Sequence, residues 1–172
     1  MKRLFPLAVV LALVAAGCSN NNSPSSATPT NPTFTAALSP ANEVPPITNA
    51  ESTVSGNATI TLVVTRDAAN NITAATATFV VNLTGFPAGS AVNIAHIHEG
   101  ATTCACPVVV NTSLAAGEVT IVNGVASFTK ANITVDPAVA QRILANPAGF
   151  YFNVHTTLNA GGVARGQLNR VS

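Results

Sequence analysis

Apolar and polar residues alternate along most of the chain from residue 34 onward. Residues 72–85, ITAATATFVVNLTG, place apolar side chains on one face of an extended strand and mostly polar ones on the other. The same period of two runs through residues 54–67, VSGNATITLVVTRD, and the AANN between these segments is typical of a turn. The pattern predicts a long β-hairpin. The predicted core residues of its second strand are Ala75, Ala77, Phe79, Val81 and Leu83.

Further segments have the composition of short strands. They are residues 34–39, 91–99, 118–122, 124–135, 150–156 and 163–171, with a tight turn expected at the VNG of 122–124. Many short antiparallel strands separated by turns predict an all-β fold, either an antiparallel β-sandwich or a Greek-key barrel.

One short helix is predicted near residues 137–146. Asp136 is a favourable N-cap residue, and Pro137 stands at the first helical position. The sequence AVAQRILA follows, and Asn146-Pro147 then stops the helix.

The first residues have the pattern of a lipoprotein leader. Lys2 and Arg3 precede an apolar run over residues 4–16, which is shorter than a membrane-spanning helix. The run ends in AAGC, which resembles a bacterial lipobox. We therefore expect residues 1–17 to be a signal peptide and Cys18 to carry the lipid. The alternative is ordinary secretion with a cysteine at that position by chance.

Residues 18–33 comprise Cys18 and a polar tether, SNNNSPSSATPTNPT, that cannot bury apolar surface and is expected to be disordered. Residues 34–172 then form the folded domain. This organisation predicts an extracytoplasmic protein of the bacterial cell envelope, held to the membrane through its lipid anchor. Ser19 after the lipidated cysteine favours the outer membrane if the cell is Gram-negative.

The composition narrows the possible partners. Charged residues make up 8% of the chain and the formal net charge is +1. An average soluble domain has about 25% charged residues. Without a basic patch, the chain is not expected to bind nucleic acid. It also contains no glycine-rich phosphate loop and no G-x-S-x-G nucleophile elbow.

The three histidines of the chain have similar strand contexts. His96 and His98 are two residues apart, so they project from one face of their strand, and His155 alternates with Val154 in the same way. The simplest arrangement puts Ala95, Ile97, Phe152 and Val154 in the core and the histidines on outer faces or under loops. Three imidazoles in this arrangement suit copper or zinc. The alternative is a polar cluster in which the imidazoles only form hydrogen bonds.

Cys104 and Cys106 remain once the leader is removed. Secretion favours oxidation, and neither cysteine has another partner in the domain. Three states are open: a disulfide between residues two apart, free or intermolecular thiols, or thiolate ligands of a soft metal beside His98.

Four motifs resemble the CHRD domain, named from chordin. In order along the chain they are NEVPP at 42–46, AHIHEG at 95–100, NPAGFYFNVHT at 146–156 and GGVARGQ at 161–167. The resemblance covers about residues 34 to 171. The family commonly has Gly- and Pro-rich residues where this chain has ATTCACP. Bacterial members are mostly single secreted or lipid-anchored domains, which agrees with the leader.

A fainter resemblance to copper/zinc superoxide dismutase implies a similar Greek-key fold and specific roles. AHIHEG is similar to the H-V-H-E strand of that enzyme, and NVHT followed by GGVARGQL is similar to its later strand and Gly-rich stretch. It implies that His96, His98 and His155 are copper ligands and that Arg165 lies beside the open position. The chain lacks the fourth histidine and the zinc-loop ligands of the enzyme.

Arg165 and Glu43 have two possible roles. The planar guanidinium of Arg165 suits an anion. Alternatively, Arg165 and Glu43 form a structural ion pair that fixes the first loop to the last strand.

These observations favour a non-enzymatic binding or interaction module of the envelope over an enzyme, with an envelope or extracellular protein as its partner. The alternative is a copper- or zinc-binding protein with a three-histidine site. The most that such a site would do is superoxide-dismutase-like chemistry. A third alternative is a purely structural surface or matrix protein.

Overall fold

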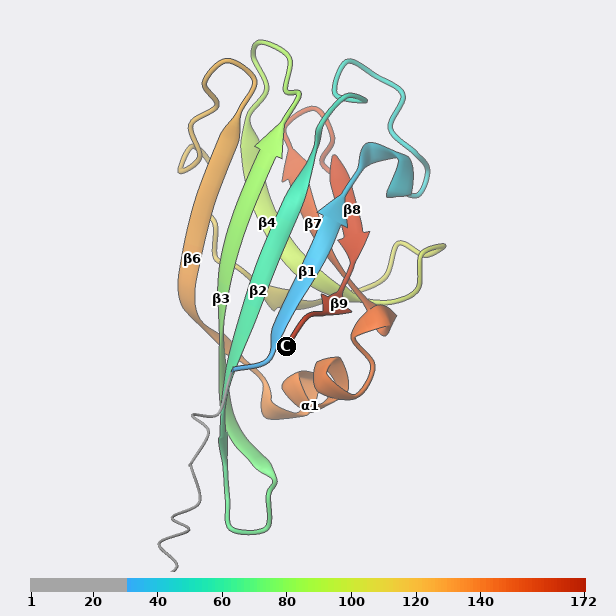
Figure 1. The fold of residues 1–172 in the computed structure, drawn as a ribbon. Helices are drawn as coiled ribbons and strands as arrows, with labels where there is room; N and C mark the ends of the chain where they lie inside the picture. Colours follow the sequence, from blue (N-terminus) through green and yellow to red (C-terminus); the bar gives the residue numbers. More distant parts are fainter. Residues whose placement is uncertain (1–30) are drawn as a thin grey trace, which may run out of the picture.

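Two antiparallel sheets pack face to face in a computed structural model that describes residues 31–172 (Figure 1). One sheet has the strand order β6-β3-β2-β1-β9 and the other has the order β5-β4-β7-β8. This architecture confirms the predicted all-β sandwich. The predicted signal peptide, Cys18 and the tether up to residue 30 lie outside the described residues. The strands are β1 (Thr33–Leu38), β2 (Ser55–Arg66), β3 (Ile72–Thr84), β4 (Val92–Glu99), β5 (Val108–Asn111), β6 (Ala126–Val135), β7 (Phe150–Thr156), β8 (Ala164–Gln167) and β9 (Asn169–Arg170).

The predicted hairpin is formed by β2 and β3, the longest strands of the five-stranded sheet. Its turn is organised by Asp67, whose carboxylate accepts hydrogen bonds from the backbone N–H groups of Ala69 and Asn71. The five predicted core residues of β3 are all at most 4% exposed, so the predicted face of the strand is correct. Burial of alternate apolar side chains fixes the register of these strands.

The predicted helix is α1 (Pro137–Ala145), at the lower end of the sandwich in Figure 1. The Asp136 side chain accepts hydrogen bonds from the N–H groups of Ala138 and Val139, as its N-cap position predicts. The helix buries Val139, Ala140 and Ile143 against the core. Within residues 31–172, no helix is long and apolar enough to cross a membrane.

Three strand predictions need correction. Residues 118–122 form no strand, although Val119 is buried and Val122 bridges Val125 across the expected turn. β5, at residues 108–111, was not predicted, because a short apolar run after Pro107 shows no alternation. Residues 163–171 are divided between two strands, β8 in one sheet and β9 in the other.

Candidate metal centre

The outer faces of β4 and β7 bring the three histidines together. His96 and His98 lie on β4, and His155 lies on its antiparallel neighbour β7. The histidines are only 5–8% exposed although they point away from the core. The predicted inner residues, Ala95, Ile97, Phe152 and Val154, are completely buried between the sheets, which confirms the predicted faces.

The ring nitrogens of the cluster converge. His96 Nδ1 and His98 Nε2 form a hydrogen bond of 3.0 Å, and the ring centroids of His96 and His155 are 4.4 Å apart. One nitrogen from each histidine lies within 4.8 Å of the other two. Within residues 31–172, these side chains form the one group of three or more His, Cys, Asp or Glu residues that is close enough to hold a metal ion.

Two of the imidazoles are oriented by backbone carbonyls. His98 Nδ1 lies 2.6 Å from the Cys106 carbonyl oxygen, and His155 Nδ1 lies 2.9 Å from that of Ala160. A carbonyl oxygen only accepts, so each Nδ1 carries the proton and each Nε2 presents a lone pair. His155 Nε2 is buried and has no hydrogen-bond partner. Carbonyl partners of this kind fix the tautomer and ring orientation of metal-binding histidines.

The surroundings keep the histidines neutral. Burial lowers the pKa of His96 to about 4, and the positive charges that His155 and His98 would carry act in the same direction. Burial also lowers the pKa of His98 and of His155 below the usual value. A neutral imidazole is the form that binds metal, so metal binding near pH 7 requires no net loss of a proton from these rings.

The donor set fits a copper or zinc ion. Three imidazole nitrogens are typical ligands of both metals, whereas calcium and magnesium require oxygen ligands. The orphaned Nε2 of His155 is a buried polar atom that a metal ion would satisfy. An ion held by three histidines would keep at least one position for water or another ligand.

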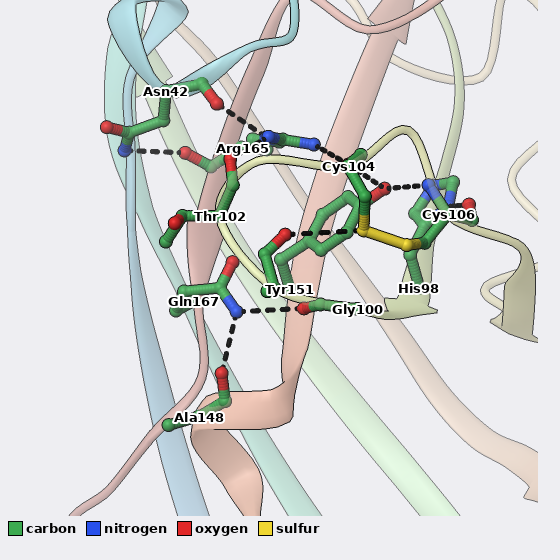
Figure 2. The surroundings of a disulfide bond; sticks show 11 residues. Asn42, His98, Gly100, Thr102, Cys104, Cys106, Ala148, Tyr151, Arg165 and Gln167 are labelled. Atoms are coloured by element: carbon green, nitrogen blue, oxygen red, sulfur yellow. Dashed lines mark hydrogen bonds between the residues drawn. A yellow bond between two sulfur atoms is a disulfide. The ribbon is translucent and has the colours of Figure 1, made fainter.

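A loop at residues 100–107 lies beside His98, one of the three histidines (Figure 2). Cys104 and Cys106 form a disulfide in this loop, which is one of the three states left open by the sequence. The Tyr151 ring stacks on the imidazole of His98, with centroids 4.6 Å apart. The Tyr151 hydroxyl accepts a hydrogen bond from the backbone N–H of Cys106. The disulfide loop is therefore tied directly to the histidine cluster.

Arg165 holds this loop and does not form the ion pair considered with Glu43. The two salt bridges of the described residues, Lys130–Glu118 and Arg142–Glu99, do not include it. Arg165 is 2% exposed and donates hydrogen bonds to the backbone carbonyls of Asn42, Thr102 and Cys104. Its guanidinium also lies 4.5 Å above the Tyr151 ring. Carbonyl oxygens satisfy these donors without a carboxylate.

Glu43 is buried near Arg165 but has an unusual carboxyl group. Burial raises its pKa to about 7, against the opposing effects of the Arg165 charge and the Asn153 side chain. Its Oε1 has no hydrogen-bond partner. Glu43 and Arg165 both line a cavity of about 450 Å³, which Gln167 also lines.

Sequence reasoning did not assign Tyr151 or Gln167 to the site. Gln167 donates to the Gly100 and Ala148 carbonyls and so holds the start of the loop (Figure 2). The available signal was strand alternation, which places Tyr151 on the same face of β7 as His155. That signal does not show which loop covers the face.

The comparison with family models agrees with the resemblance drawn from the motifs. The family model of the CHRD domain matches residues 34–168. The search of curated proteins and the search of solved structures gave no match to this chain.

Proposed function

The chain belongs to the CHRD-domain family, and we propose that it is a non-enzymatic binding module of the cell envelope whose ligand is a copper or zinc ion. His96, His98 and His155 hold this ion. At the level of the family, the domain supports a role in binding or interaction; the metal is the finer part of the proposal.

The observation that carries the proposal is the orientation of the three rings. Nitrogens that belong to two different strands face one another, while the opposite nitrogens of His98 and His155 donate to carbonyls. A cluster that served only to form hydrogen bonds would be expected to satisfy His155 Nε2, because a buried polar atom without a partner costs about 1–3 kcal/mol. A bound ion removes that cost.

The test is metal binding by the purified full chain. Copper and zinc would be titrated by calorimetry, with metal content measured after dialysis, for wild type and for His96→Ala, His98→Ala and His155→Ala. We expect one ion per chain, lost in each histidine variant because all three side chains are ligands. Asn93→Ala is the matched control, since Asn93 lies on β4 outside the cluster.

A wild-type chain that binds neither metal, or histidine variants that still bind one ion, would refute the proposed site. Circular dichroism of each variant would show that the fold is retained.

The envelope part of the proposal rests on the leader pattern that ends at Cys18. Labelled palmitate should enter wild type in bacterial cells and should be absent from Cys18→Ser, because that thiol is the expected acceptor. Absence of label from wild type would contradict the lipid anchor without affecting the metal site.

A further inference from the structure

The loop at residues 100–107 is held at several points, but its last part lacks a charged anchor. Gln167 binds the Gly100 carbonyl, and Arg165 binds the carbonyls of Thr102 and Cys104. Neither side chain reaches the Cys106 carbonyl, which accepts the hydrogen bond from a histidine of the candidate metal centre.

The disulfide connects these two parts of the loop. It joins Cys104, whose carbonyl Arg165 holds, to Cys106, whose carbonyl orients His98. Cys106 is also held by its N–H bond to the Tyr151 hydroxyl, at 3.0 Å, and the next residue, Pro107, accepts a hydrogen bond from the Glu99 N–H. The disulfide is the covalent link between Cys106 and the part of the loop that Arg165 holds.

This disulfide is poorly suited to stabilising the whole fold. It links residues two apart, and the entropy that a cross-link removes from the unfolded chain grows with the length of the loop it closes. Both cysteines are only partly buried, so a small thiol reductant can reach them. Its contacts point instead to a local function at the candidate metal centre.

We propose that the Cys104–Cys106 disulfide is a redox-sensitive holder of His98, so that oxidation favours metal binding and reduction releases the ion. The part of this inference that concerns metal rests on the proposed function. In the reduction, the S–S bond breaks and the two sulfurs take up two electrons and two protons from a dithiol reductant. The reductant becomes a disulfide. The freed loop then no longer fixes the Cys106 carbonyl, and His98 loses its orientation.

The first arm of the test needs no metal. Full-length protein with ¹⁵N-labelled histidine would be examined by NMR as oxidised wild type, as wild type reduced with dithiothreitol, and as Cys104→Ser/Cys106→Ser. In oxidised wild type, the His98 Nδ1 proton should be protected from exchange with water by its short hydrogen bond to the Cys106 carbonyl. The reduced protein and the double variant should lose that protection, while the His155 Nδ1 proton keeps its own.

The second arm measures zinc affinity, because zinc does not change oxidation state. The reductant would be removed without oxygen before zinc is added. Loss of a partner that orients a ligand typically lowers metal affinity by about 10- to 100-fold. We expect that decrease both for reduced wild type and for the double serine variant. Thr103→Ala, in the same loop, should bind zinc as wild type does.

Each outcome decides a different statement. If the protection of the His98 proton and the zinc affinity do not change on reduction, the proposal that the disulfide orients His98 is refuted. Tighter zinc binding by reduced wild type, but not by the double variant, would make the thiolates ligands and would also refute it. If no form binds zinc, the metal proposal fails, and the NMR arm still tests whether the disulfide orients His98.

Discussion

Burial has opposite consequences for the histidines and for Glu43. The histidine pKa values fall because burial disfavours the protonated, charged imidazole. The pKa of Glu43 rises to about 7 because burial disfavours the charged carboxylate. Near neutral pH, these shifts leave the histidines uncharged and Glu43 partly protonated, in a region where Arg165 is the nearby permanent charge.

The carboxyl of Glu43 should make stability fall as the pH rises. Its pKa is higher in the folded state than in the unfolded state, so its protonation favours folding below pH 4.5 and this effect is lost as the pH passes 7. Glu43→Gln, which cannot ionise, should be more stable than wild type at pH 8. One pKa unit corresponds to 1.36 kcal/mol, and after allowance for partial solvation we expect a gain of about 1–2 kcal/mol.

Urea unfolding of both proteins at several pH values would measure this gain. The difference should disappear by about pH 4.5, where both side chains are neutral. Glu99→Gln is the control, because Glu99 is partly exposed and its pKa is lowered by Arg142, so it should give no gain at pH 8. Equal stability of Glu43→Gln and wild type at pH 8 would contradict the raised pKa.

The histidines could be grouped from the sequence, but their surroundings could not. Alternation alone places His96 and His98 on one face, because side chains two apart point the same way. The partners of Arg165 are the backbone carbonyls of Asn42 and of two residues in the loop at residues 100–107. Every residue type has the same backbone carbonyl, so the sequence does not mark these partners. Sequence reasoning therefore considered only charged partners of Arg165, an anion or the carboxylate of Glu43.

Among the elements, long regular segments were predictable and short or divided ones were not. β2 and β3 combine alternation with a recognisable turn, so their bounds agree with prediction to within a residue or two. Residues 163–171 keep one alternating pattern while the chain changes sheets at Leu168, which is completely buried. Because this alternation continues across Leu168, it does not show where the chain passes from one sheet to the other.

The N-cap of α1 should contribute measurably to stability. Asp136 satisfies two N–H groups at the start of the helix, and Asp136→Ala leaves them without that partner. A lost N-cap of this type typically costs about 1 kcal/mol. We expect urea unfolding of Asp136→Ala to show a lower midpoint with an unchanged slope.

Gln141→Ala provides the matched control, since Gln141 is exposed in the middle of the same helix. Its stability should remain within about 0.5 kcal/mol of wild type. If Asp136→Ala unfolds at the wild-type midpoint, solvent replaces the cap and α1 depends on its buried face alone.

At the scale of the whole molecule, the candidate site joins parts of the chain that are far apart in sequence. His96 and His155 become neighbours only when β4 pairs with β7, and the inner faces of both strands pack against the other sheet. The unfolded chain cannot keep the three imidazoles together. A metal ion that binds the folded state alone must therefore stabilise the complete sandwich.

The resulting prediction concerns thermal unfolding with and without metal. Free zinc at one hundred times its dissociation constant adds about 2.7 kcal/mol to the stability of the folded state. For a domain of this size, that gain raises Tm by on the order of 10 °C. Scanning calorimetry should show the increase for wild type, and a chelator should reverse it.

His155→Ala should unfold at the same temperature with and without zinc, because it lacks the ligand from β7. Its own metal-free Tm reports any loss of packing, so the comparison within the variant isolates the metal. An equal increase in wild type and His155→Ala would show that zinc stabilises the protein from another position. The prediction that an ion held by the three histidines stabilises the sandwich would then be wrong, even if calorimetry at room temperature detected a bound ion.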